Sequence, residues 1–175
     1  MLMTIIKLQN SLFRRKERFV PLDPENVRMY LCGPTVYDRA HLGNARNVIM
    51  FDVLFRLLRH VWAEDHVTYV RNFTDVDDKI IRRAAEQGME PMALAEKYIR
   101  HFQRDAENLG LIEPDSEPRV STSIPDIVDM IQTLVDKGHA YPSGGSVWFN
   151  VPSFKSYGGL SGQKVDALQS ADSVP

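Results

Sequence analysis

Residues 28–73 read RMYLCGPTVYDRAHLGNARNVIMFDVLFRLLRHVWAEDHVTYVRNF, and this stretch decides the fold. Its opening, residues 28–36, is a mostly apolar strand that runs into a Gly-Pro turn. From Leu42 to Trp62, apolar side chains recur every three or four residues, which predicts a helix with one broad apolar face. Residues 67–73 have the β-branched and aromatic content of a buried strand. Strand, helix and strand in this order predict a βαβ unit whose two strands are parallel neighbours.

The remainder of the chain is mostly helical in pattern. Thr74, followed by Asp75, Asp77 and Asp78, predicts a capped helix with an acidic first turn, which Gly88 ends. Because the helix dipole favours acidic residues there, we do not interpret the three aspartates as a metal site. The later pattern predicts helices over 91–109 and 124–137, with a loop that carries two prolines between them over 111–121. It also predicts a hairpin near 139–151 and a poorly ordered tail from residue 153.

Composition excludes some classes of function. The chain has 21 basic and 23 acidic residues, a net charge of −2, whereas a nucleic-acid-binding domain is usually basic. Any RNA contact therefore has to come from a local patch or from other parts of a longer protein. The sequence contains no run of eighteen apolar residues and therefore predicts no membrane-spanning helix. The single cysteine, Cys32, excludes an internal disulfide and is typical of a reducing cytoplasm.

The motif CGPTVYDRAHLGNAR, residues 32–46, lies where the first strand leads into the helix. Open α/β sheets bind ligands at such strand ends. His41 and Asn44 are three residues apart and share one face of the helix start, where free N–H groups attract phosphate. Gly43 would let a flat base approach the backbone. The alternative, which this short pattern alone favours, is that His41 is only a helix cap and Gly43 only a packing glycine.

Longer motifs carry a resemblance to a known family. The run CGPTVYD-x-AHLGNAR-x-x-x-x-FDVL and the later YVRNFTDVDDKIIRRA, residues 69–84, closely resemble two signature blocks of the cysteine–tRNA ligases, which are class I aminoacyl-tRNA synthetases. EPRVSTSIPDI, KGHAY and SYGGLSG match in order and spacing, so that the resemblance covers roughly residues 5–168. The cysteine ligases of mycothiol biosynthesis are close cousins, but their segment corresponding to TDVDDKI usually differs.

The resemblance implies a fold class and a division of the chain. The fold is α/β: the first half of a Rossmann-like, HUP-type nucleotide-binding domain with a parallel sheet, a helical segment and a small hairpin. Residues 1–110 would form the first half of the catalytic domain. Residues 111–175 would contribute a helix, the hairpin and the start of the connective insertion.

The resemblance also implies substrates and site residues. The family activates L-cysteine with ATP and transfers it to tRNA(Cys) in the cytoplasm. Cys32 would be a zinc ligand, and zinc would select the substrate thiol over a hydroxyl. Carried over from the family, the ATP and aminoacyl sites would consist of Gly33, Thr35, His41, Gly43, Asn44, Asn72 and Thr74, with His41 and Asn44 as the catalytic phosphate binders.

The chain departs from the family's pattern in two respects. It contains no Lys-Met-Ser-Lys-Ser motif, because neither Lys155 nor Lys164 lies in a similar context. It also lacks the Trp-His-Ile-Glu-Cys-like region that supplies the other zinc ligands. The alternative function is therefore a non-catalytic, truncated paralogue that acts as a binding or regulatory module. Otherwise the chain is part of a cysteine–tRNA ligase, and we expect these 175 residues to be inactive alone.

Overall fold

The computed structural model describes residues 5–163, and these fall into two compact units. The first unit is continuous in sequence and runs from Pro21 to Ile124. The second combines residues 5–20 with residues 125–163. The predicted tail beyond residue 163 lies outside the described residues. Over residues 5–163, no helix combines the length and the apolar character that a membrane span requires.

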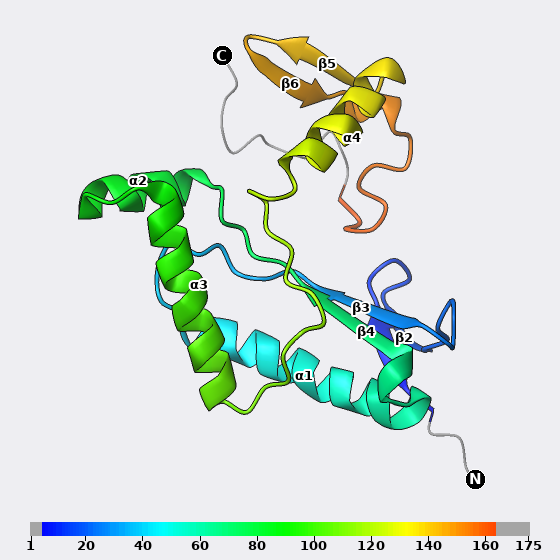
Figure 1. The fold of residues 1–175 in the computed structure, drawn as a ribbon. Helices are drawn as coiled ribbons and strands as arrows, with labels where there is room; N and C mark the ends of the chain where they lie inside the picture. The colour runs from blue at the N-terminus through cyan, green and yellow to red at the C-terminus, as the bar shows by residue number, and fades with distance from the viewer. Residues whose placement is uncertain (1–4, 164–175) are drawn as a thin grey trace. The chain divides into compact units, whose positions relative to one another are not determined.

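The continuous unit is built on the predicted βαβ element (Figure 1). Strands β3, Val27–Leu31, and β4, Val67–Arg71, pair in parallel, with Val27 opposite Val67 and Leu31 opposite Arg71. Helix α1, Leu42–Trp62, and a short 3-10 turn, η1, Glu64–His66, make the crossover. The predicted strands and helix are confirmed, although both ladders end earlier than residues 36 and 73.

Helix α1 packs its apolar face against the sheet. Val48, Phe55 and Leu58 are buried, and the Phe55 ring lies 5.0 Å from the ring of Tyr69 on β4. Asp52 is buried on the same helix, where its carboxylate accepts hydrogen bonds from the Ile112 backbone N–H at 2.8 Å and from Arg56 at 2.7 Å. A buried carboxylate needs such partners, so Asp52 ties α1 to the loop that follows α3.

Two further helices complete this unit. Helix α2, Asp78–Gln87, ends at Gly88, whose left-handed φ of 62° is the conformation that a helix C-cap needs. Helix α3, Pro91–Asn108, begins with proline in its first turn and buries one side of its length. Phe102 of α3 meets Phe73, just beyond β4, edge to face at 5.6 Å. The helix predicted over 91–109 is thus confirmed.

Residues 114–119 were predicted to be a loop, and they pair with β4 as a third, irregular strand. The N–H of Arg71 donates to Ser116 O at 3.1 Å, and the N–H of Phe73 donates to Pro118 O at 2.9 Å. The bridges Val70↔Ser116 and Phe73↔Arg119 are parallel. Pro114 and Pro118 explain why no regular strand forms, because proline lacks the N–H that a ladder requires.

The second unit contains two hairpins and a helix. Strands β1, Lys7–Asn10, and β2, Arg15–Arg18, form an antiparallel hairpin that the sequence analysis did not predict. Helix α4 spans Ile124–Asp136. The predicted second hairpin is confirmed as β5, Ala140–Ser143, with β6, Ser146–Phe149. A 3-10 turn, η2, Val151–Ser153, follows, and the chain continues in turns to residue 163.

Candidate functional site

The start of α1 is closed by a reciprocal cap. His41 is the N-cap residue, and its ring Nδ1 accepts a hydrogen bond from the Gly43 N–H at 3.0 Å. In return, the His41 N–H donates to Asn44 Oδ1 at 3.1 Å. Both side chains therefore satisfy backbone groups at the helix end, and the capping role that we considered for His41 is present.

This cap leaves two donors on the same side chains. Because Nδ1 of His41 accepts a hydrogen bond, the proton of the neutral ring lies on Nε2, which is then a donor. Asn44 uses its oxygen in the cap, so its amide NH2 group also remains a donor. A helix N-terminus that presents two side-chain donors is suited to bind an anionic group.

Gly43 gives the His41 ring its room. A Cβ at position 43 would lie 2.7 Å from Cε1 and 2.9 Å from Nδ1 of that ring, closer than side chains approach. The glycine is thus needed for the cap itself. Its suggested contact with adenine stays a prediction.

The two strand ends are joined just before this helix. The Gly33 N–H donates to Asn72 Oδ1 at 2.7 Å. Beyond it, Thr35 and Thr74 form a parallel bridge, in which the Thr74 N–H donates to Pro34 O at 3.1 Å and the Val36 N–H donates to Thr74 O at 3.2 Å. Thr35 and Thr74 are therefore neighbours, as expected from parallel strands.

A pocket of about 220 Å³ opens beside the cap. Thr35, His41 and Asn44 all line it, so three of the predicted site residues share one concavity. Thr74 is not among the lining residues, although it adjoins Thr35. The wall also contains Tyr98 and Phe102, two buried residues of α3. No sequence signal distinguished a pocket wall from core packing at these two positions.

Thr74 does not cap α2, contrary to our prediction. The cap is Asp77, whose carboxylate accepts a hydrogen bond from the Lys79 N–H at 2.8 Å. Thr74 lies three residues before the Asp77 cap, and its backbone N–H and C=O are used in the bridge to the other strand end. Only Asp78 lies in the first turn of α2.

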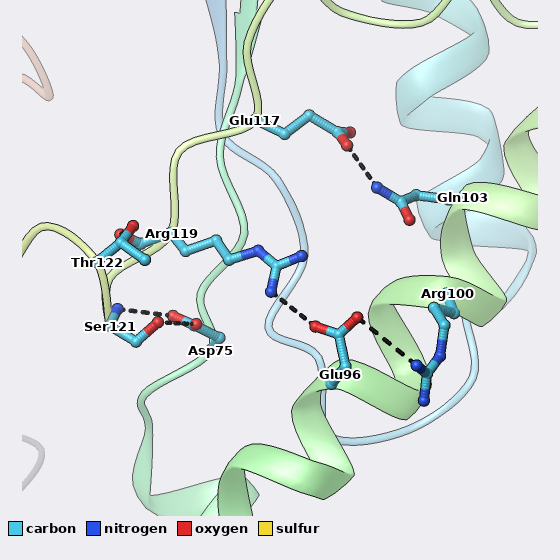
Figure 2. Close-up of polar contacts among 8 residues, drawn as sticks. All are labelled: Asp75, Glu96, Arg100, Gln103, Glu117, Arg119, Ser121 and Thr122. Atoms are coloured by element: carbon cyan, nitrogen blue, oxygen red, sulfur yellow. Dashed lines mark hydrogen bonds and ion pairs between the residues drawn. The ribbon is translucent and has the colours of Figure 1, made fainter.

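Asp75 has a separate structural role, shown in Figure 2. It is 1% exposed, and its carboxylate accepts hydrogen bonds from both the N–H, at 3.0 Å, and the hydroxyl of Ser121. Segment 117–123, which we call the strap, is also anchored to α3. There, Arg119 pairs with Glu96 at 2.7 Å and Gln103 donates to Glu117 at 2.7 Å. The strap therefore holds the backbone that adjoins Thr74.

The loop before the cap is held by α2. Arg83 pairs with Asp38 at 3.0 Å, and the Lys79 ammonium lies 5.7 Å from the centre of the Tyr37 ring. Hydrogen bonding to Glu86 and the charge of Asp38 raise the pKa of the Arg83 guanidinium above its ordinary value. Arg83 is thus bound to the site loop.

Cys32 is exposed at the end of β3, and its thiol lies 3.8 Å from Gly33 O. Among residues 5–163, no group of three or more His, Cys, Asp or Glu side chains could hold a metal ion. One thiol does not make a zinc site, which needs three or four protein ligands. The described residues therefore do not fit zinc.

Comparison with known sequences places the chain among synthetases. The family model for tRNA synthetases class I (C) catalytic domain matches residues 18–175. A cysteine–tRNA ligase of Ruegeria pomeroyi is 60% identical over 167 residues, which cover 95% of this chain and 36% of that protein. The cysteine–tRNA ligase of Sinorhizobium medicae is 51% identical over 180 residues, covering 98% of this chain and 38% of that protein. The chain thus spans little more than a third of these relatives.

A solved structure agrees with the fold. It is the agnB2 LeuRS of Agrobacterium radiobacter K84, in a ternary complex with tRNA and LeuAMS. The TM-score is 0.58 at 20% sequence identity, and the match covers 70% of this chain and 16% of that one. At this identity the likeness concerns the fold alone.

Proposed function

Because the chain belongs to the class I (C) tRNA synthetase catalytic-domain family, we propose that it serves in an enzyme that activates L-cysteine with ATP and transfers it to tRNA(Cys). It corresponds to the N-terminal part of a cysteine–tRNA ligase, with identities of 50–60% to relatives of that name. Since it spans little more than a third of their length, the activity belongs to the longer protein. The single cysteine supports a cytoplasmic location.

The cap at the start of α1 is the observation that carries this proposal. The acceptor atoms of His41 and Asn44 are used by the cap, and their donor atoms remain for a ligand in the adjoining pocket. In the activation step, the cysteine carboxylate attacks the α-phosphorus of ATP, and the bond to the β-phosphate oxygen breaks. Pyrophosphate leaves with the additional negative charge. His41 Nε2–H and the Asn44 NH2 group would donate to the phosphate oxygens on which that charge develops.

The amino acid would bind at the joined strand ends. Gly33 and Thr35 lie on one strand end, and Asn72 and Thr74 lie on the other. The Thr74 hydroxyl and the neighbouring backbone would receive the substrate ammonium group, and Cys32 is exposed at the same edge. Fixing both reactants at one sheet edge lowers the barrier by positioning rather than by acid–base chemistry.

Two variants separate the cap from the phosphate contact. In a full-length protein that carries this chain, His41→Ala removes both, and we expect it to lower cysteine-dependent ATP–pyrophosphate exchange about 10²-fold or more. His41→Ser keeps a good N-cap side chain, but its short hydroxyl lies close to the backbone and cannot donate from the position of Nε2. We expect its thermal stability to stay near wild type and its exchange rate to fall nearly as far as that of His41→Ala.

The exchange rates decide between these roles of His41. Full exchange activity in His41→Ser would leave His41 with the capping role only and remove the proposed phosphate contact. Exchange with another amino acid but not with cysteine would contradict the proposed substrate. If the wild-type full-length protein catalysed no exchange at all, the proposed function itself would be wrong.

A further inference from the structure

The N-terminal hairpin concentrates positive charge. Residues 7–18, which contain β1, β2 and their turn, hold five of the chain's 21 basic residues and one of its 23 acidic residues. The chain as a whole carries a net charge of −2. The hairpin is therefore a basic element in an otherwise acidic protein.

The strand register sorts these charges by face. Directly opposed residues of an antiparallel pair lie on the same face, and successive residues alternate between faces. Lys7 is opposite Arg18, and Gln9 is opposite Lys16. All four are exposed. We call this surface, formed by Lys7, Gln9, Lys16 and Arg18, the cationic face.

The only acid of the hairpin lies on the other face. Glu17 accepts hydrogen bonds from Asn10 and from Arg15, each at 2.9 Å. The hydrogen bond from Arg15 holds the pKa of the Glu17 carboxyl below its usual range, so the acid stays ionised there. Within residues 5–163, Lys7, Lys16 and Arg18 have no ion-pair partner.

Such an arrangement is unfavourable without an external counter-charge. Like charges directly opposite each other destabilise a sheet, and Lys7 and Arg18 are such a pair in strands only four residues long. A two-stranded ribbon is too flat to enclose a small anion. Its cations are spaced by about 4.8 Å between strands and about 6.7 Å along a strand, an array that suits a polymer of regularly spaced anions.

We propose that the cationic face binds the phosphate backbone of RNA. The choice of RNA rests on the proposed function, because a tRNA ligase must hold an RNA whose phosphates dominate affinity. The face contains cations and one amide but no apolar side chain. The exposed Leu12 and Phe13 belong to the turn, away from the paired residues. A purely polar face matches phosphodiesters rather than a lipid surface, where apolar side chains insert beside basic ones.

The salt dependence of binding tests this proposal. We would titrate the 175-residue chain into a fluorescent tRNA(Cys) transcript over a range of salt concentrations. Each phosphate contact contributes about 0.7–0.9 to the slope of log affinity against log salt. The triple variant Lys7→Gln, Lys16→Gln, Arg18→Gln should therefore show a slope smaller by about 2–3. The matched control Arg82→Gln, Arg104→Gln, Lys137→Gln removes the same charge elsewhere and should change the slope little.

The hairpin variant should melt no lower than wild type, because it relieves like-charge repulsion. An equal loss of slope in both triple variants would reduce the effect to general attraction and overturn the proposal. So would stronger binding to vesicles of phosphatidylserine and phosphatidylcholine than to the transcript.

A separate measurement distinguishes this proposal from the proposed function. Cysteine-dependent ATP–pyrophosphate exchange requires no RNA, so a full-length protein with the hairpin variant should keep its exchange rate while tRNA charging falls. Unchanged charging would count against the cationic face. Absent exchange in the wild type would count against the ligase function and leave the RNA-binding result standing.

Discussion

At the scale of single residues, Gly33 occupies a position that has no room for a side chain. A Cβ there would lie 1.6 Å from the backbone oxygen of Asn72, which cannot move without breaking the joined strand ends. We expect Gly33→Ala to lower the free energy of unfolding of the chain by about 1–3 kcal/mol, the usual range for overpacking. Urea unfolding followed by circular dichroism measures this. Gly43→Ala is the comparison: its Cβ meets the His41 ring, a side chain that can turn away at the cost of the cap, and it should cost less than a clash with backbone.

Tyr69 makes the free energy of unfolding of the chain decrease at alkaline pH. Burial raises the pKa of its phenol above the ordinary value, so above pH about 10 the unfolded chain loses this proton before the folded chain does. The Tyr69 contribution is therefore complete below pH about 10 and is lost as the pH rises through the folded-state pKa. Tyr69→Phe should weaken this alkaline decline, whereas Tyr141→Phe, at an exposed tyrosine, should not. Equal pH profiles for wild type and Tyr69→Phe would refute the assignment.

Sequence reasoning at this scale succeeded where spacing alone determines position. The three-residue interval between His41 and Asn44 placed both at one helix start. It could not reveal that Gly43 makes room for the His41 ring, because that contact depends on the rotamer of the histidine. Nor could it place the cap of α2 at Asp77 rather than Thr74, because the bridge to Thr35 comes from a strand end 39 residues earlier.

At the scale of elements, the strap depends on one buried carboxylate. Ser121→Ala removes the hydroxyl that donates to Asp75 and leaves one oxygen of this buried carboxyl group without its donor. We expect a loss of about 1–3 kcal/mol in the free energy of unfolding. Ser123→Ala removes a hydroxyl that donates only to the Arg119 carbonyl, at 2.8 Å, and should cost less. Urea unfolding of both variants provides the comparison. Equal losses in the free energy of unfolding would show that the hydrogen bond to Asp75 stabilises the fold no more than the one to the Arg119 carbonyl.

Periodicity predicted the helices and the parallel pair well because their apolar faces are long. It failed for β1 and β2, since KLQN and RKER carry almost no apolar alternation. The pattern also failed for residues 114–119, where two prolines indicated a loop. The N–H groups of Arg71 and Phe73 nevertheless donate to carbonyl oxygens of this segment. Short polar strands are specified by their partners, and a partner is not visible in a local pattern.

At the scale of the whole molecule, the 175 residues contain only part of the proposed catalytic machinery. In the proposed function, charge stabilisation comes from the cap of α1 and from a Lys-Met-Ser-Lys-Ser motif, and these 175 residues contain only the first. Loss of one such donor raises a barrier by about 3–4 kcal/mol. We expect the isolated chain to show neither cysteine-dependent exchange nor tRNA charging, and to retain much less than one zinc per chain after dialysis. Exchange clearly above that of a His41→Ala control would overturn this expectation.

The second unit is assembled from two stretches that the ribosome makes at different times. Residues 5–20 emerge first, but residues 125–163 follow only after the whole of Pro21–Ile124 has been translated. At about 5–20 residues per second, this interval lasts on the order of 5–20 s. During it, the basic hairpin leaves the ribosome, a particle rich in RNA, without the rest of its unit. With the RNA affinity proposed for the cationic face, the hairpin of a nascent chain is attracted to ribosomal RNA, and its release becomes a timed step in the maturation of the protein.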